Sequence, residues 1–347
     1  MNSGDEMNLV LENIEKKYGD QQILKGISLT FNKGEFNTIF GVSGSGKSTL
    51  LKIISGIEKP DTGKVYIETV DISNVQAEKR NIGFVFQKPL LFPHMTVREN
   101  IAFGLRVKFL KASTIDSKVN QLLTLLGIAE LKDRYPHEIS GGQQQRVAIG
   151  RALANEPRLL LMDEPFNGLD QKLRYEMGQL IKSIQKVYNL TIIFVTHDLD
   201  ECLRLSDRIA ILSEGTILQH DFSNVVYYQP NSVQVAELMG PGNWINGNVR
   251  NGIFTSRFGY LDTPEYADGK YVLFLRPHQL ELTHHADGVN FKVKEVERIG
   301  KIQRIICEVS DETIILERIY VLEKQIDLTE YKLKLNITQV NLLAFVG

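Results

Sequence analysis

The sequence predicts an α/β domain with a largely parallel sheet, followed by a smaller all-β domain. Helical patterns alternate with four short apolar runs in the first part of the chain. From about residue 241 the chain changes to β-rich segments, with no convincing long amphipathic helix between them. The four apolar runs have the composition of strands buried on both faces, and they are Phe36–Phe40, Ile82–Phe86, Leu159–Met162 and Ile192–Val195.

Composition limits the classes of function. The 347 residues leave room for two or three domains, and 40 basic against 42 acidic side chains give a net charge of −2, so we expect no nucleic-acid partner. The two cysteines, Cys202 and Cys307, lie far apart in sequence, which favours a reducing compartment. Because neither a signal peptide nor a membrane-spanning apolar run is evident, we expect a soluble, cytoplasmic protein that contacts a membrane only through a partner.

The order of the patterns divides the chain. Leucines between residues 97 and 131, followed by the helix stop Gly127, predict a helical insertion at about 89–154 within a domain of residues 1–240. The turn Pro241-Gly242 is the predicted hinge, and residues 241–347 are predicted to form an antiparallel barrel or sandwich. Its expected strands are Tyr271–Leu275, Phe291–Val296, Thr313–Leu316 and Lys332–Ile337.

A glycine-rich loop, GVSGSGKST at residues 41–49, joins the first apolar run to the apolar start of a helix. The glycines let successive N–H groups point inward, and the helix N-terminus adds partial positive charge, so the loop suits a polyphosphate. Lys47 would reach the β and γ phosphates, and the Ser48 hydroxyl would bind Mg²⁺. A surface loop without a ligand is the alternative. The predicted nucleotide-binding residues here are Gly41, Val42, Ser43, Gly44, Ser45, Gly46, Lys47, Ser48 and Thr49.

Polar side chains follow the other predicted strands. Asp163 and Glu164 end an apolar run, where a carboxylate is costly unless a cation or hydrogen bonds meet it. We expect Asp163 to hold Mg²⁺ opposite the loop serine, and Glu164 to act as the general base for an attacking water. His197 would contact a γ-phosphate oxygen, and Gln87 would reach metal or water through its amide. Exposed acids capping a strand end are the alternative.

A second glycine turn opens another helix, in the stretch Ser140-Gly141-Gly142-Gln143-Gln144. It offers helix N–H groups to an anion but has no lysine of its own. One chain with two phosphate-binding surfaces and one catalytic set suggests that the second surface serves a neighbour's nucleotide. Its predicted contacts are Ser140, Gly141, Gly142 and Gln143.

These motifs together resemble the ATP-binding subunits of ABC transporters over roughly residues 8 to 240. The resemblance includes the Walker A loop, the Q-loop glutamine, the signature motif, the Walker B strand, the D-loop at Asn167 to Asp170 and the switch histidine. It implies a P-loop NTPase core of the RecA-like type with a helical subdomain, and a head-to-tail dimer around two ATP molecules. It also implies that Tyr18 stacks on adenine; a core tyrosine is the alternative.

The C-terminal part resembles the small OB-like or TOBE-like barrel of importer subunits for sulfate, molybdate, ferric iron, polyamines and sugars. The segments Phe274–His278 and Leu91–Asn100 carry this resemblance. It implies a membrane permease as partner and, indirectly, a solute-binding protein. The tail favours sulfate or thiosulfate, with ferric iron next. Molybdate, polyamine or sugar import, an exporter and a non-transport ABC ATPase are the alternatives.

Overall fold

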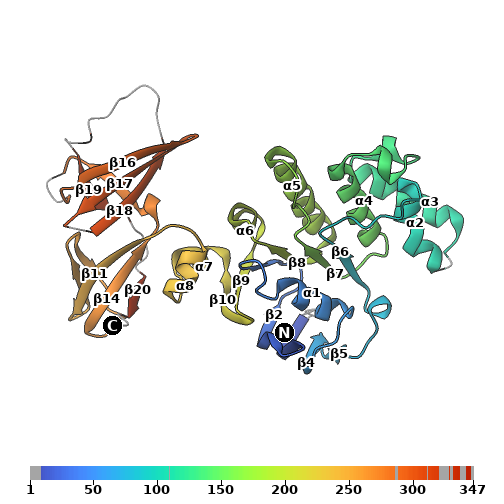
Figure 1. Ribbon diagram of the computed structural model, residues 1–347, viewed down its shortest axis with the longest axis horizontal. Helices are drawn as coiled ribbons and strands as arrows, with labels where there is room; N and C mark the ends of the chain where they lie inside the picture. The colour runs from blue at the N-terminus through green and yellow to red at the C-terminus, as the bar shows by residue number, and fades with distance from the viewer. Residues whose placement is uncertain are drawn as a thin grey trace, which may run out of the picture. The chain divides into compact units, whose positions relative to one another are not determined.

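The computed structural model describes residues 9–108, 110–285, 288–310, 312–319, 328, 331–336 and 341–344. It divides the chain into two compact units, Met1–Ser223 and Asn224–Gly347, which are drawn in Figure 1. None of the described helices combines the length and the apolar character that crossing a bilayer demands.

A six-stranded sheet forms the centre of the first unit, in the order β10-β9-β3-β8-β7-β6. Its inner strands are parallel, and only β10 pairs antiparallel, with β9. The apolar runs predicted as strands all lie in it, because residues buried on both faces need a sheet covered on both sides. The strands are β3 (Phe36–Phe40), β6 (Ile82–Val85), β7 (Leu159–Asp163), β8 (Thr191–Thr196), β9 (Arg208–Ser213) and β10 (Thr216–Phe222).

A second sheet, of four antiparallel strands in the order β2-β1-β4-β5, covers one side of this centre together with α1 (Lys47–Ser55). Leu50, Leu51 and Ile54 of α1 share one apolar core with Ile39 of β3 and with the inner side chains of β1 and β2. The helix therefore begins at a fixed position over the end of β3. The strands are β1 (Leu9–Tyr18), β2 (Gln21–Phe31), β4 (Thr62–Ile67) and β5 (Val70–Asp71).

Helices cover the opposite face of the six-stranded sheet, and α1 and α5 lie on opposite sides of it in Figure 1. The helical insertion is not a separate core, because its apolar side chains pack in the same cluster as Phe36 and Phe194 of the sheet and Ile181 of α5. The helices are α2 (Val97–Val107), α3 (Ala112–Leu125), α4 (Gly141–Leu153), α5 (Gln171–Tyr188) and α6 (Leu199–Leu205). Short 3-10 turns lie at Ala77–Lys79, Ala129–Leu131 and Pro136–Glu138.

The second unit is built from antiparallel strands, as predicted, with two helices at its start. Its described strands form sheets in the orders β13-β12-β11-β14-β20, β15-β19 and β16-β17-β18. The elements are α7 (Ser223–Tyr228), α8 (Val233–Leu238), β11 (Asn243–Arg250), β12 (Ile253–Ser256), β13 (Gly259–Asp262), β14 (Gly269–Leu275), a 3-10 turn (Pro277–Gln279), β15 (Leu280–Thr283), β16 (Lys292–Ile299), β17 (Ile302–Val309), β18 (Glu312–Ile319), β19 (Lys332–Leu335) and β20 (Leu342–Ala344).

The division between the units differs from the predicted boundary at residues 240 and 241. One cause is Arg276, whose side chain is fully buried after β14 and donates to four backbone carbonyls. Its Nε donates to the carbonyl of Tyr227 at 3.0 Å, and its Nη1 donates to those of Ala236, Gly240 and Pro241 at 2.8 to 3.1 Å. Helices α7 and α8 therefore belong to the β-rich unit, and the carbonyl of Pro241 accepts a hydrogen bond from Arg276.

We expect Arg276→Met to loosen the attachment of α7 and α8. The variant leaves four carbonyls without their donor, and burying unpaired polar groups costs the unit about 2–4 kcal/mol of unfolding free energy. Amide hydrogen exchange should rise in residues 224–250, while ATP binding by the first unit stays unchanged. Arg250→Met, at an exposed position of β11, is the control. Unchanged exchange in the Arg276 variant would show that the guanidinium does not hold these helices.

Candidate functional site

The parallel register brings the predicted phosphate-site residues to one edge of the sheet. Phe40, the last residue of β3, pairs with Thr196, and Asp163 of β7 pairs with Val195. The loop that begins at Gly41, the two carboxylates and His197 therefore leave adjacent strands at their carboxyl ends. This is the edge at which open α/β sheets bind ligands.

The glycines of the loop are required by its shape. Gly44 and Gly46 have φ of +83° and +106°, in the left-handed region that side chains disfavour. A Cβ on Gly41 would lie 2.1 Å from the carbonyl oxygen of Leu212. The loop thus turns tightly against β9 and delivers the chain to the first turn of α1.

Lys47 and Ser48 lie at the start of α1 and face the loop and the carboxylates. Lys47 is 5% exposed, and its Nζ donates to the carbonyls of Gly41 at 2.9 Å and Val42 at 2.8 Å. Burial lowers the pKa of Lys47, against the opposing effect of Glu164 and Asp163. The Lys47 ammonium is therefore held over the loop, where a polyphosphate would replace the carbonyls as its partner.

The Ser48 hydroxyl donates to Asp163 Oδ1 at 2.8 Å, so two oxygen ligands lie side by side. Burial raises the pKa of Asp163, and the hydrogen bond from Ser48 opposes that rise. Hydroxyl and carboxylate oxygens are the ligands that Mg²⁺ takes in nucleotide sites. The donor set fits the ion that the sequence predicts.

Glu164 is placed by its backbone. Its φ is +43°, its N–H donates to the carbonyl of Val195 at 3.0 Å, and Pro165 follows it. The carboxylate lies between two polar groups: Gln87 Nε2 donates to Oε2 at 3.4 Å, and His197 Nδ1 lies 3.2 Å from Oε1. The structure thus brings together the three side chains predicted to act on an attacking water.

A cavity of about 440 Å³ opens between the loop and the side chains of Gln87 and Glu164, and His197 does not line it. Its lining includes Ile23 on β2, which the sequence analysis missed because an apolar residue in an alternating strand carries no signal of a binding role. The lining residues are Ile23, Ser43, Gly44, Gly46, Lys47, Ser48, Thr49, Gln87 and Glu164.

Some predicted residues lie outside this cavity. Tyr18 is 47% exposed at the end of β1, and its hydroxyl donates to Glu58, so the ring remains available for stacking. Val42 is 55% exposed, whereas Ser45 is 5% exposed, with no hydrogen-bond partner for its Oγ among the described residues. Ser140 to Gln143 form the first turn of α4 and do not line the cavity.

The turn at Ser140 is closed by a capping box. Ser140 Oγ accepts from the Gln143 N–H at 3.3 Å, and Gln143 Oε1 accepts from the Ser140 N–H at 2.9 Å. Gly142 packs against Leu173 of α5, and a Cβ there would lie 2.4 Å from that side chain. Gly141 faces open space. The N-terminus of α4 is thus rigid and accessible to an anion that comes from outside the chain.

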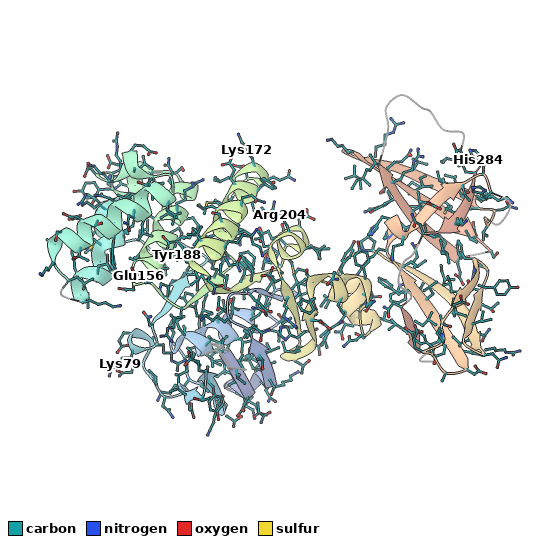
Figure 2. The ribbon with its side chains drawn as sticks, turned by 180° about the vertical axis from the view of Figure 1, so that it is seen from behind. Lys79, Glu156, Lys172, Tyr188, Arg204 and His284 are labelled. Atoms are coloured by element: carbon teal, nitrogen blue, oxygen red, sulfur yellow. The ribbon has the colours of Figure 1, made fainter. Side chains whose placement is uncertain are left out.

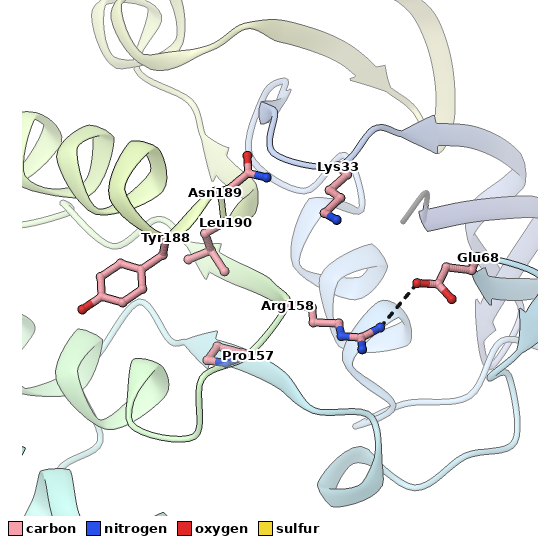
Figure 3. Close-up of a pocket in the computed structure, with 7 residues that line it drawn as sticks. All are labelled: Lys33, Glu68, Pro157, Arg158, Tyr188, Asn189 and Leu190. Atoms are coloured by element: carbon pink, nitrogen blue, oxygen red, sulfur yellow. Dashed lines mark hydrogen bonds and ion pairs between the residues drawn. The ribbon is translucent and has the colours of Figure 1, made fainter. Parts of the chain in front are cut away.

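A different and larger pocket, of about 650 Å³, lies at the amino ends of β3, β7 and β8 (Figure 3). Arg158 and Glu68 face each other in it at 3.4 Å. Its lining shares no residue with the phosphate-site cavity. Since ligands of parallel sheets bind at the carboxyl ends, we place the functional site at the loop and not here.

Comparisons with known proteins show which family the chain belongs to. The family model described as "ABC transporter" matches residues 24–167. A sulfate/thiosulfate import ATP-binding protein CysA of Halalkalibacterium halodurans is 37% identical over 90% of this chain and 90% of its own length. The chain belongs to the ATP-binding subunits of ABC importers. Its predicted fold class and its ATPase activity are confirmed by this membership.

Further relatives of this ABC subunit include a spermidine/putrescine import ATP-binding protein PotA of Aggregatibacter actinomycetemcomitans, 41% identical over 79% of this chain and 77% of its own. Among solved structures, cbiO1 of Clostridium perfringens, part of the complex cbiONQ, has a TM-score of 0.60 at 35% identity, over 64% of this chain and 90% of its own. The cassette MJ0796, a dimer in a post-hydrolysis state bound to ADP and Pi, has a TM-score of 0.57 at 35% identity, over 62% and 98%.

We expect Asp163→Asn to stabilise the nucleotide-free subunit and to abolish Mg²⁺-dependent turnover. Burial raises the pKa of Asp163 in the folded state, so the protonated form favours folding below the unfolded pKa of about 3.9, and this contribution disappears as the pH rises through the folded value. Asparagine stays neutral at every pH, so the variant does not lose this stability as the pH rises. Its melting temperature should exceed the parent's by a few degrees at pH 7 and by less at pH 4, in calorimetry without nucleotide. An equal difference at both pH values would contradict this.

Proposed function

We propose that this ABC subunit hydrolyses Mg²⁺-bound ATP at the cavity beside residues 41–49, with Glu164 as the general base. The observation that carries the proposal is the position of the Glu164 carboxylate, between the Gln87 amide and the His197 imidazole. A water held against this carboxylate can lose a proton to it as the oxygen attacks the γ phosphorus, and the bond from that phosphorus to the β–γ bridging oxygen breaks, so that ADP and phosphate are released. His197 and Lys47 then stabilise the negative charge on the phosphoryl oxygens.

Mg²⁺ would be held by Ser48 and Asp163, with Gln87 at its open side. When bound, it supplies neutralising charge for the β and γ phosphates. Tyr18 would stack on adenine, since its ring is exposed beyond the end of the loop. The loop amides from Gly41 to Thr49 hold the phosphates in this scheme.

The subunit works as a head-to-tail dimer in this proposal. Support comes from the turn at Ser140, Gly141, Gly142 and Gln143. A capping box holds the turn, Gly141 faces open space, and none of the four residues lines the chain's own cavity. One solved relative, the cassette MJ0796, is described as dimeric in two structures. Each ATP would then lie between the loop of one copy and the α4 N-terminus of the other, so that occupancy draws the two copies together.

The solute is proposed to be sulfate or thiosulfate. Relatives named as sulfate/thiosulfate import proteins are 37% to 42% identical and align with 80% to 90% of this chain. A polyamine is the second candidate, because the PotA relative is 41% identical over a similar share. The subunit would act at the cytoplasmic side of the inner or plasma membrane, bound to permease subunits that receive the solute from a binding protein.

We expect Glu164→Gln to bind ATP while losing at least about 100-fold in turnover, the range of a general base. The amide keeps the shape of the side chain but cannot accept the proton. Mixed with Mg²⁺-ATP, the variant should accumulate as a dimer in size-exclusion chromatography with light scattering, whereas the parent returns to the monomer as ATP is spent. Near-normal turnover of the variant would refute the role of Glu164.

Uptake by the reconstituted complex tests the solute. The subunit, its permease and its binding protein in proteoliposomes should accumulate labelled sulfate when ATP is supplied inside, and unlabelled thiosulfate should compete. Labelled spermidine, ferric iron and molybdate are tested in parallel with the Glu164→Gln complex as background. Spermidine uptake without sulfate uptake would replace the first candidate by the second.

A further inference from the structure

Three polar side chains, of Arg174, Asp198 and Glu201, form a network next to the pair of Glu164 and His197. Arg174, in the first turns of α5, donates from Nη1 to Asp198 Oδ2 at 2.6 Å. Its Nη2 donates to the carbonyl of Leu169 at 3.2 Å, and its Nε lies 3.4 Å from Glu201 Oε1. One guanidinium thus contacts the loop before α5, the residue after His197 and the first turn of α6.

The network fixes the backbone on both sides of His197. Asp198 Oδ1 accepts from the Glu201 N–H at 3.0 Å, and the Asp198 N–H donates to Thr196 Oγ1 at 3.0 Å. Glu201 is 4% exposed, and its Oε2 accepts from Thr196 Oγ1 at 2.7 Å. Residues 196 and 198 are therefore held by the same cluster of hydrogen bonds, and the peptide that carries the imidazole lies between them.

The imidazole itself receives little orientation from packing, because the side chain of His197 is 52% exposed. Its distance to Glu164 depends on how residues 196 to 198 are held. A small cavity of about 40 Å³ lies between residues 164–167, Arg174 and the histidine loop. Its lining includes Glu164, Asn167, Arg174 and His197. The Arg174 side chain reaches both the histidine loop and the segment 167–170, and Glu164 also contacts both, through His197 and the Asn167 N–H.

Charge explains why an arginine is suited to this position. Asp198 and Glu201 both face the guanidinium, and a buried carboxylate such as that of Glu201 is costly without a cation or hydrogen bonds. The planar fork of arginine supplies several donors in fixed directions, which a lysine cannot do. The carbonyl of Leu169 takes one of them, so the segment 167–170 is held by the same rigid group.

We propose that Arg174 is a positioning residue for ATP hydrolysis, which holds His197 against Glu164 and couples the histidine to the segment 167–170. This inference rests on the roles proposed for Glu164 and His197. Arg174 touches neither nucleotide nor water in this scheme. It acts through His197. A displacement of residues 167–170 would be transmitted to the imidazole by the side chain of Arg174.

The test is a double-mutant cycle on the full chain, with steady-state Mg²⁺-ATP hydrolysis as the readout. Arg174→Met should lower kcat by about 10–100-fold, the range for groups that orient a functional ligand, with KM changed by less than about 2-fold. His197→Ala should be slow, and the double variant should be no slower than His197→Ala alone, because Arg174 then has nothing to position.

Two substitutions control for structure. Lys182→Met, also on α5, removes a contact of the same kind to the far end of α6, since Lys182 donates to the Leu205 carbonyl at 2.8 Å and to Asp207 at 2.9 Å. Arg204→Met removes another arginine of this region, labelled in Figure 2, which lies over the Tyr175 ring at 4.8 Å. Both variants should keep the parent's kcat.

Asp198→Asn keeps the proposal testable if Arg174→Met fails to fold. Asparagine caps α6 as well as aspartate does, but it weakens the charged bond to Arg174. It should lower kcat without changing KM, and it should have no effect in the His197→Ala background.

The outcomes distinguish the role proposed for His197 from the role proposed for Arg174. Full turnover by His197→Ala would overturn the proposed role of the histidine, and with it this inference. A slow His197→Ala together with a normal Arg174→Met, or a further 10-fold loss in the double variant, would overturn the inference alone. An equal loss in Lys182→Met would do the same, by showing a general effect on the packing of α5 against α6.

Discussion

Parallel hydrogen bonding among β3, β8, β7 and β6 is the constraint on which the site depends. The pairs Phe40 with Thr196 and Val85 with Met162 fix where each strand ends. Gln87, Asp163, Glu164 and His197 follow within two residues of those ends, and the loop that leads to Lys47 begins directly after Phe40. A shift of one strand by a single residue would turn its side chains to the other face of the sheet. The apolar clusters on both faces prevent such a shift, so the packing of the core determines the geometry of the site.

Burial opposes ionisation at two groups of the cavity. It lowers the pKa of Lys47 and raises that of Asp163, so each shift disfavours the charged form. In the nucleotide-free protein, loop carbonyls and the Ser48 hydroxyl compensate only in part. A ligand that carries both phosphate and a divalent cation would pair with the Lys47 ammonium and the Asp163 carboxylate at the same time. Because such a ligand binds the folded state preferentially, it stabilises the folded protein by mass action.

The sequence allowed prediction of elements whose signal is local. The strand Phe36–Phe40 was predicted with its observed bounds, because an apolar run ended by a glycine turn is a local pattern. Features that depend on distant side chains could not be predicted. Helices α7 and α8 are joined to the β-rich unit in part by Arg276, which donates to carbonyls 35 to 49 residues earlier. Arg174 was missed for the same reason, since its charged partners Asp198 and Glu201 lie at the start of another helix, and Ile23 joins the cavity only through the fold.

The left-handed backbone at Glu164 has a further consequence. A φ of +43°, with proline next in the chain, disfavours β-branched side chains at this position whatever their chemistry. The main chain therefore fixes the direction of the Cα–Cβ bond, while the contacts with Gln87 and His197 place the carboxylate. Residues that tolerate the left-handed region, such as asparagine and glycine, would keep the course of the chain while removing the carboxylate, so the set of sequences that can fold here is wider than the set that can supply the proposed base.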